Sequence, residues 1–149
     1  VYKLTAIENN GEIVSKIKIS ANVEKITTPG FKQVYRLFDR DSNKAIADVV
    51  TEHDELIDSS QPYEIFHPLY TWKRKTVKNF YTKKLLVKIF DKGKQVYDTP
   101  DIHDIRDYCK EQIDTLWDEV KRFEKPHEYI VDLSQSIWDV KNKLLKENQ

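Results

Sequence analysis

The sequence predicts an α+β fold in which antiparallel strands come first and two amphipathic helices follow. Residues 1–98 contain short segments of alternating apolar and polar residues separated by turn-forming pairs, which is typical of β-hairpins. Residues 99–149 instead carry apolar residues at steps of three and four, which is the spacing of one helical face. We therefore expect residues 1–149 to form one domain with a strand-rich part followed by a helical part.

Length, composition and charge restrict the class of protein. The chain has 149 residues, the usual size of one domain with a full core. Hydrophobic residues make up 39% and charged residues 34%, a balance typical of globular proteins. Lysine plus arginine number 25, as do aspartate plus glutamate, so the chain as a whole does not attract nucleic acid or anionic membranes. No apolar run approaches a membrane span and the single cysteine, Cys109, lacks a disulfide partner, so we expect a cytoplasmic protein.

Three β-hairpins are predicted in the strand-rich part, each from two segments that flank a turn. They span residues 1–19, 34–50 and 85–97, and their turns lie at residues 9–11, 39–43 and 91–94. Ile17 and Ile19 are predicted to lie in a half-buried strand of the first hairpin. Gly93 suits the positive φ angle that the third turn requires. Residues 51–64 are rich in acidic side chains and are expected to form a connection.

The first predicted helix covers about residues 100–124. Its apolar face consists of Ile102, Ile105, Cys109, Ile113, Leu116, Val120 and Phe123. Thr99 is predicted to cap this helix, and Pro126 is predicted to stop it. Because Cys109 lies on the apolar face, we expect it to pack as a small hydrophobic side chain rather than to act as a nucleophile.

The second predicted helix covers about residues 133–146. Its apolar face consists of Leu133, Ile137, Val140 and Leu144. Asp132 followed three residues later by Gln135 resembles a capping box, so we expect this helix to begin directly after Asp132.

Metal ligands and catalytic residues are not predicted in this chain. Asp39, Asp41 and Asn43 match the first half of a calcium-binding loop. That loop would need a glycine where Lys44 stands and a glutamate where Val50 stands, so a plain turn is favoured. The histidines show no ligand spacing; they are His53, His67, His103 and His127.

A basic run from Trp72 to Lys84 interleaves lysine and arginine with aromatic residues. One interpretation is a stand-alone module in which cations bind phosphates and rings stack on the bases of a nucleic acid, or in which the cations bind another anionic partner. The other is a solvated sheet edge whose lysines prevent aggregation, with Trp72 and Phe80 in the core. The neutral net charge favours the sheet edge and makes a nucleic-acid partner the less favoured prediction.

The stretch EKITTPGFKQVYR, residues 24–36, places cations on both sides of a Pro29-Gly30 turn. Proline followed by glycine suits a type II turn, which needs no lysines. Lys25, Lys32 and Arg36 are therefore either ordinary solvated charges or contacts for a phosphate group.

Several segments resemble the C-terminal part of bacterial nicotinate phosphoribosyltransferases. They are VYKLTAIE at 1–8, EKITTPGFKQVYR at 24–36, KAIADVV at 44–50, YTWKRKTV at 70–77 and DTLWDEVKRFEKPHEYIVDLSQSIWDVKNKLL at 114–145. The resemblance covers nearly the whole chain in order. It agrees with a sequence that begins at Val1 inside an alternating segment and lacks methionine, from which we expect a piece of a longer polypeptide.

The resemblance implies an enzyme of NAD salvage, a transferase that joins nicotinate to phosphoribosyl pyrophosphate and releases nicotinate mononucleotide. It also implies coupled ATP hydrolysis through a phosphorylated histidine, with Mg²⁺, and a homodimer of irregular α/β barrels. These catalytic parts precede Val1, so the isolated fragment is expected to be inactive and to have the rest of its own chain as partner.

One segment of this chain matches a frame found near the phosphate chain in related nicotinamide-using enzymes. That frame is a lysine, a glycine-containing turn and an arginine, which Lys25, Gly30 and Arg36 match by spacing. The resemblance implies that Lys25 stabilises negative charge on a departing pyrophosphate or on ATP, with Lys32 and Arg36 nearby.

Overall fold

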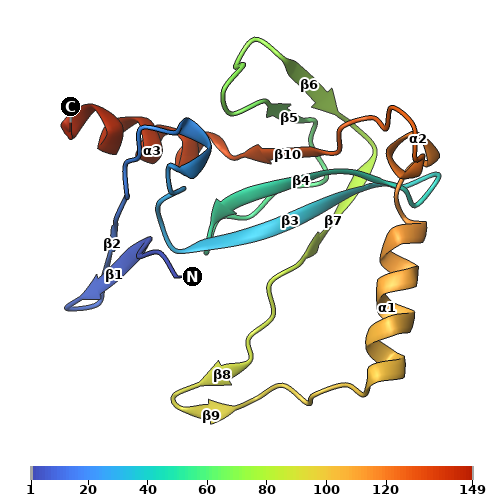
Figure 1. Ribbon diagram of the computed structural model, residues 1–149, viewed down its shortest axis with the longest axis horizontal. Helices are drawn as coiled ribbons and strands as arrows, with labels where there is room; N and C mark the ends of the chain where they lie inside the picture. The colour runs from blue at the N-terminus through green and yellow to red at the C-terminus, as the bar shows by residue number, and fades with distance from the viewer. Residues whose placement is uncertain (1, 149) are drawn as a thin grey trace.

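A four-stranded mixed sheet organises the computed structural model, which describes residues 2–148 (Figure 1). The strands are β1 (Ala6–Asn9), β2 (Glu12–Ser15), β3 (Lys32–Asp39), β4 (Ala45–Glu52), β5 (Tyr63–Phe66), β6 (Arg74–Val77), β7 (Phe80–Lys84), β8 (Phe90–Asp91), β9 (Lys94–Gln95) and β10 (Ile130–Leu133). The helices are the 3₁₀ turn η1 (Val23–Lys25), α1 (Ile102–Asp114), α2 (Asp118–Lys121) and α3 (Gln135–Glu147). The central sheet has the order β10-β4-β3-β7, and three two-stranded sheets, β1-β2, β5-β6 and β8-β9, surround it.

The β3–β4 hairpin supplies most of the core because its residues alternate between two faces. Tyr35 lies opposite Val49 and Leu37 opposite Ala47, and all four are buried on the same face. The same hydrophobic cluster includes Ile65 of β5, Val77 of β6 and Phe80 of β7. The core is therefore enclosed by strands of the central sheet and of the β5–β6 sheet. Fully burying a side chain of this size contributes about 2 kcal/mol.

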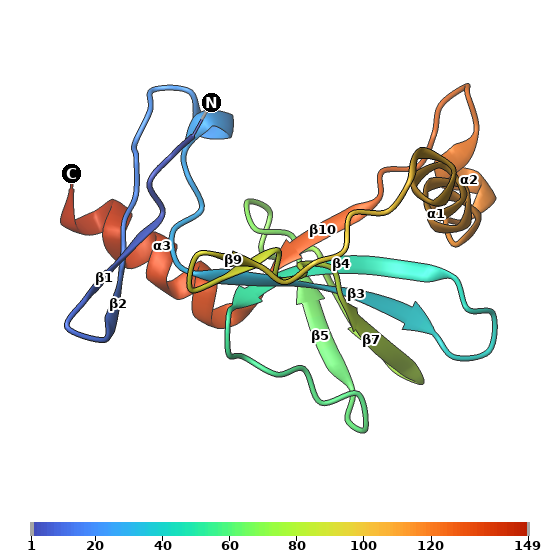
Figure 2. The same cartoon turned by 90° about the horizontal axis from the view of Figure 1, so that it is seen from below.

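Strand β10 ties the C-terminal third to this sheet by pairing parallel to β4. Ile130 lies beside Ala47 and Asp132 beside Val49, so both side chains are directed to the core face. Helix α3 follows directly: the Ser134 hydroxyl caps it by accepting a hydrogen bond from the Ile137 backbone N–H. Figure 2 shows α3 and the β1–β2 hairpin at one end of the sheet and α1 and α2 at the other.

The Pro29-Gly30 turn is held between the β1–β2 hairpin and α3. The Gly30 backbone N–H donates a 2.8 Å hydrogen bond to the Thr5 carbonyl. Gly30 has a φ of 98°, and a Cβ atom there would lie 3.3 Å from Ile137 Cδ1, whose side chain is 0% exposed. The turn therefore needs glycine for its backbone angle and for its contact with α3.

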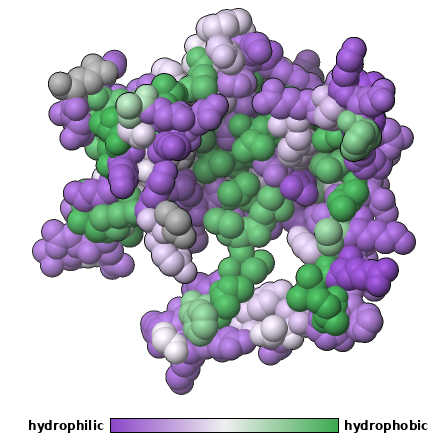
Figure 3. All heavy atoms as spheres, viewed as in Figure 1, coloured by the Kyte–Doolittle hydropathy of each residue, from purple (hydrophilic) through white to green (hydrophobic). Residues whose placement is uncertain are grey.

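Residues 86–113 leave most of their apolar side chains in solvent. In Figure 1 the chain leaves β7, forms the small β8–β9 hairpin away from the sheet and returns through α1. Helix α1 has no buried residue. The exposed apolar side chains, which we call the apolar arch, are Leu86, Val87, Ile89, Phe90, Val96, Tyr97, Ile102, Ile105, Tyr108 and Ile113. Figure 3 shows hydrophobic residues continuing from the body of the molecule into the apolar arch.

The α+β class is confirmed, with helices towards the C-terminus, and the β3–β4 hairpin lies where the sequence predicts it. The other two predicted hairpins are shorter than expected. Ile17 and Ile19 lie outside any strand, and the third hairpin is reduced to the two-residue strands β8 and β9. Strand β5 is additional and begins inside the predicted acidic connection. Strands β6 and β7 lie in the basic run, and β7 forms an edge of the central sheet, in agreement with the favoured interpretation of that run.

The predicted helix at about 100–124 is wrong in its extent, because α1 ends at Asp114 and only the four-residue α2 follows. Neighbouring segments capture the carbonyls at this point: the Ala45 N–H bonds the Thr115 carbonyl at 2.8 Å, and Lys44 Nζ bonds the Asp114 carbonyl at 2.7 Å. Asp101 rather than Thr99 caps α1, since its carboxylate accepts from two backbone N–H groups.

The helix predicted at about 133–146 begins at Gln135 instead. Its cap is Ser134 rather than Asp132, because pairing with β4 holds Asp132 and Leu133 in an extended strand. Two predicted burials are also wrong: Trp72 is 73% exposed and Cys109 is exposed, whereas Phe80 is buried as predicted. Among residues 2–148, no helix is long and apolar enough to cross a membrane.

The Gly30→Ala change should lower the free energy of unfolding by about 1–2 kcal/mol more than Gly11→Ala. Both glycines have positive φ angles, but a Cβ atom at Gly11 would meet nothing within 4 Å. The difference between the two variants in urea denaturation therefore isolates the contact with Ile137. Equal losses in both variants would contradict close packing of the turn against α3.

The Asp132→Asn change should stabilise the fold at neutral pH. Asp132 is 3% exposed, and this burial raises the pKa of its carboxyl to about 6, although His67 lowers it somewhat. In the unfolded chain the pKa is about 3.9, so the folded state holds an extra proton between about pH 4 and 6. Raising the pH through this window removes up to about 3 kcal/mol of stability from the original protein.

Urea denaturation at pH 4.5 and 7.5 measures this effect. Tyr63 and His67 lie beside Asp132 in both proteins, so comparing the variant with the original protein at each pH isolates the effect of the Asp132 carboxyl. The stability advantage of Asp132→Asn should grow as the pH rises. An advantage that is the same at the two pH values would show that the carboxyl is not desolvated.

Candidate functional site

Lys25 is the predicted phosphate contact that the structure leaves in solvent. It is the last residue of η1, just before the segment that leads to the Pro29-Gly30 turn, and its side chain is exposed. Only its backbone makes hydrogen bonds: the N–H donates to the Asn22 carbonyl, and the carbonyl accepts from Lys3 Nζ at 2.7 Å. Its ammonium group makes no hydrogen bond or ion pair within residues 2–148, so it is available to an anion.

Lys32 has a structural role at the start of β3. Its Nζ atom donates to the Thr28 carbonyl at 3.0 Å and to the Gly30 carbonyl at 2.7 Å. Burial lowers the pKa of this ammonium group. Lys32 therefore closes the turn around Gly30, and its donors are already in use.

Arg36 is held by an internal ion pair across the β3–β4 hairpin. Its Nε atom lies 2.8 Å from Asp48 Oδ1 and its Nη2 atom 2.9 Å from Asp48 Oδ2, which is a bidentate pair. The Tyr129 hydroxyl donates to Asp48 Oδ1 at 2.9 Å, and the Arg36 guanidinium lies 5.8 Å from the Tyr129 ring centre. The hydrogen bond with Asp48 raises the pKa of Arg36 further above its usual range, while burial raises the pKa of Tyr129.

The three predicted cations therefore do not share one ligand site in this structure. Lys32 and Arg36 lie four residues apart on one strand, roughly 13 Å, and each has its own internal partner. Lys25 lies on a separate turn. Its contact with a phosphate stays a prediction, and so does any part played by the other two.

The basic run from Trp72 to Lys84 does not form one continuous face. Its residues are divided between β6, in a two-stranded sheet, and β7, in the central sheet. Phe80 is buried, Tyr81 stacks on Phe38 with ring centres 5.0 Å apart, and Arg74 pairs with Glu64. Bases could therefore stack on few of its rings, and nothing in this arrangement favours the stand-alone nucleic-acid module.

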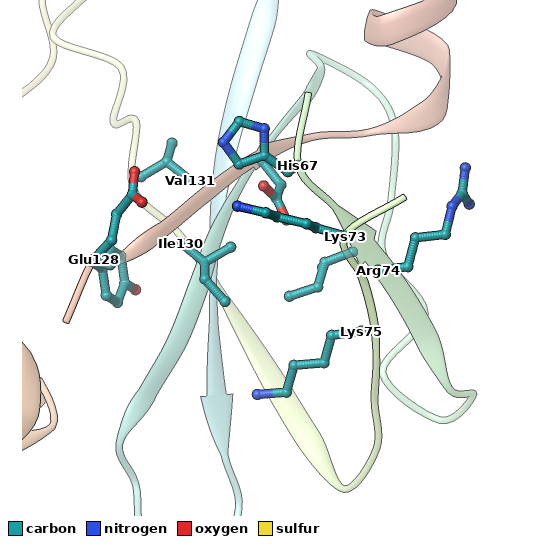
Figure 4. A pocket seen from close by; sticks show the side chains of 10 residues that line it. His67, Lys73, Arg74, Lys75, Glu128, Ile130 and Val131 are labelled. Carbon is teal, nitrogen blue, oxygen red and sulfur yellow. The ribbon is translucent and has the colours of Figure 1, made fainter. Parts of the chain in front are cut away.

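A pocket of about 400 Å³ lies where β6 faces β10. Figure 4 shows Lys73, Lys75 and His67 around it on one side and Glu128 and Ile130 on the other. Asp132 completes its floor, between His67 and the core. This pocket brings together segments more than 50 residues apart, and only the pairing of β10 with β4 places them there.

Sequence reasoning missed this pocket for two reasons. The lysines were visible as a basic run, but which of them share a face depends on where β6 begins. Asp132 was assigned to a helix cap. The β-branched pair Ile130-Val131 before it is the signal that favours a strand, whose alternation would direct Asp132 and Ile130 to the same side.

The chain is similar to curated proteins named nicotinate phosphoribosyltransferase. It is 44% identical to the protein of Bacillus subtilis over 147 residues, which are 99% of this chain and 30% of that protein. It is 32% identical over 151 residues to the protein of Dictyostelium discoideum, covering 97% of this chain and 25% of that protein. The chain thus spans less than a third of the length of these relatives.

The fold also resembles part of a solved structure, that of human nicotinic acid phosphoribosyltransferase. The TM-score is 0.68 at 22% sequence identity, and the match covers 78% of this chain and 23% of the human chain. At this identity the likeness supports the fold alone.

A family model described as the nicotinate phosphoribosyltransferase C-terminal domain matches residues 31–141. The matched region contains the whole central sheet, both strands that form the pocket and most of α3. The chain belongs to the family of nicotinate phosphoribosyltransferase C-terminal domains.

Proposed function

We propose that this chain works as the C-terminal domain of an enzyme that joins nicotinate to phosphoribosyl pyrophosphate in NAD salvage. The observation that carries the proposal is 44% identity to a named nicotinate phosphoribosyltransferase along 99% of the chain. Products would be nicotinate mononucleotide and pyrophosphate, with ATP as a further substrate that enters with Mg²⁺. The proposal places the enzyme in the cytoplasm as a homodimer.

The catalytic groups of this reaction would lie in polypeptide outside the present chain. The chain spans about 30% of its Bacillus relative, and its own four histidines lie on unconnected elements. The domain would contribute to chemistry through fixed positive charge at its edge. Lys25 supports this role, because an ammonium group without an internal partner can stabilise charge that develops on phosphate oxygens.

The apolar arch supports a docking role towards the rest of the polypeptide. Ten large apolar side chains from residues 86–113 are exposed, although α1 has the periodicity of a helix with one buried face. Contiguous exposed apolar surface marks an interaction site in most proteins. We infer that the barrel domain of the same enzyme covers the arch, which would bury Ile105 and Ile113 on the face of α1 that carries Cys109.

Activity assays test the central proposal. The natural polypeptide that contains this sequence should form nicotinate mononucleotide from nicotinate, phosphoribosyl pyrophosphate and ATP. The 149-residue chain alone should form none, since the reacting groups would be missing. Absence of this activity from the longer polypeptide would overturn the proposal.

Within that enzyme, Lys25→Ala should reduce kcat/KM for phosphoribosyl pyrophosphate or ATP by about tenfold or more, which is the loss expected for one charge-assisted contact. Steady-state kinetics measure the effect. Lys18→Ala is the matched control, because Lys18 is an exposed lysine on the neighbouring segment, where its carbonyl accepts from the Thr27 N–H. Equally small effects of the two changes would show that Lys25 is an ordinary solvated charge.

Cys109 reports directly on coverage of the apolar arch. Its thiol is exposed in this chain, so N-ethylmaleimide should label it readily in the 149-residue protein. In the longer enzyme the barrel should slow labelling by about tenfold or more, because reaction would require local opening. Mass spectrometry of the peptide that contains Cys109 measures both rates.

A cysteine on the opposite face of α1 provides the control for this labelling. Glu111→Cys in a Cys109→Ser background places a thiol about 200° around the helix from position 109. This control should react at similar rates in the two proteins. Unchanged labelling of Cys109 in the longer enzyme would show that another surface makes the docking contact.

A further inference from the structure

The pocket between β6 and β10 has a buried carboxylate that lacks a partner. Asp132 is 3% exposed and lines the pocket. Its backbone pairs with β4, but its carboxylate makes no hydrogen bond or ion pair among residues 2–148. Most buried polar groups in proteins are hydrogen-bonded, and an unpaired buried carboxylate is costly. Within the described chain only Thr27 Oγ1 is a fully enclosed polar side-chain atom without a partner, so the Asp132 oxygens reach the pocket surface, where they can accept hydrogen bonds from a molecule that enters it.

His67 lies beside Asp132 and uses one ring nitrogen internally. Its Nδ1 atom accepts hydrogen bonds from the Leu69 N–H at 3.1 Å and the Tyr70 N–H at 3.0 Å. Because Nδ1 accepts, the ring proton lies on Nε2, which makes no hydrogen bond within the described chain. The ring thus offers one further N–H group to the pocket it lines.

Two lysines near His67 make this side of the pocket cationic. Lys73 directly precedes β6 and Lys75 lies within it, and both line the pocket. Neither ammonium group has a carboxylate partner within residues 2–148. Arg74 between them is directed away, as Figure 4 shows, and pairs with Glu64.

Hydrogen-bond donors and a carboxylate acceptor thus line the same cavity. A simple anion would satisfy the lysines but would be repelled by Asp132, while an amine would satisfy Asp132 but not the lysines. Sugar hydroxyls commonly donate to a buried carboxylate, and a phosphate group commonly accepts from lysine and histidine. Ile65 and Ile130 line the cavity and suit the carbon face of a sugar ring.

We propose that this pocket binds a sugar phosphate, with the phosphate on Lys73 and Lys75 and the sugar hydroxyls on Asp132. A cavity of about 400 Å³ is within the range of small-ligand sites. Glu128 also lines the pocket, but its side chain is exposed, so solvent screens its repulsion of the phosphate. The site goes beyond the transferase activity proposed above, because none of the residues assigned to that activity lines it.

Isothermal titration calorimetry with ribose 5-phosphate and with AMP tests the proposal. The titrations use the natural polypeptide that contains these residues and are repeated on the 149-residue chain at pH 7.5. One binding event should disappear or weaken about tenfold in Lys75→Ala, as loss of one charge-assisted contact would cause. Binding of ribose 5-phosphate but not AMP would identify a free sugar phosphate as the ligand, and binding of both would extend the site to nucleotides.

Asp132→Asn separates a sugar phosphate site from a plain cationic patch. This change should weaken ribose 5-phosphate about tenfold, because a hydroxyl acceptor is lost. It should leave inorganic phosphate bound equally or more tightly, because repulsion is removed. Circular dichroism checks that the variant is folded, and its expected higher stability at this pH makes unfolding a distinguishable outcome.

Lys78→Ala is the charge-matched control, since Lys78 lies three residues beyond Lys75 and does not line this pocket. Its affinity for ribose 5-phosphate should be unchanged. The proposal is overturned if neither probe binds at millimolar concentration, if Lys78→Ala weakens binding as much as Lys75→Ala, or if Asp132→Asn binds ribose 5-phosphate as tightly as the original protein.

Discussion

The parallel pairing of β10 with β4 is the interaction on which the rest of this structure depends. It joins residues about 80 positions apart and determines where the C-terminal third lies. Because β10 takes its register from β4, Tyr129 reaches the Arg36–Asp48 pair, Asp132 enters the core face, and Ser134 is placed to begin α3. The Ser134 hydroxyl also donates to the Glu55 carboxylate at 2.7 Å, which ties the start of α3 to the segment after β4. Without this pairing the pocket would lose one wall and the Pro29-Gly30 turn would lose its contact with α3.

The chain has one region whose apolar side chains are buried and another whose apolar side chains are exposed. Around β3 and β4, apolar side chains are enclosed by strands from both halves of the sequence, and the cross-strand pair of Arg36 and Asp48 is bidentate and largely shielded. Breaking one partner of such a pair is costly, because the other charge is left without compensation in a medium that solvates it poorly. In the apolar arch, by contrast, the apolar side chains are exposed. They have helix and hairpin periodicity, but no other element of the described chain covers them. This contrast is the physical basis for the proposal that residues 86–113 form an interface.

Several cations of this domain are used internally. Lys32 and Lys44 donate to backbone carbonyls, and Arg36 and Arg74 pair with carboxylates. A count of lysines and arginines therefore overestimates the charge available to a ligand, and clustering in sequence is a weak guide to clustering in space. Lys25, Lys73 and Lys75 are the cations for which a binding role is proposed; none has a carboxylate partner within residues 2–148, although Lys73 Nζ lies 4.9 Å from the Tyr70 ring centre.

The sequence by itself determined the α+β class, the β3–β4 hairpin, the helical period of α1 and α3 and the family resemblance that the comparisons confirmed. These features are local: alternation, turn chemistry and helical spacing are written in neighbouring residues. The tertiary structure alone decided that Ile130–Leu133 is a strand, that Asp48 is the partner of Arg36, that Asp132 is buried and unpaired, and that α1 stops at Asp114. Each of these depends on hydrogen bonds or burial supplied by segments distant in the chain, and β10 is too short for its own residues to specify a strand against the helix that follows. Whether an apolar face is covered is likewise decided by its neighbours in space, which is why the same periodicity gives a buried Ile137 in α3 and an exposed Cys109 in α1.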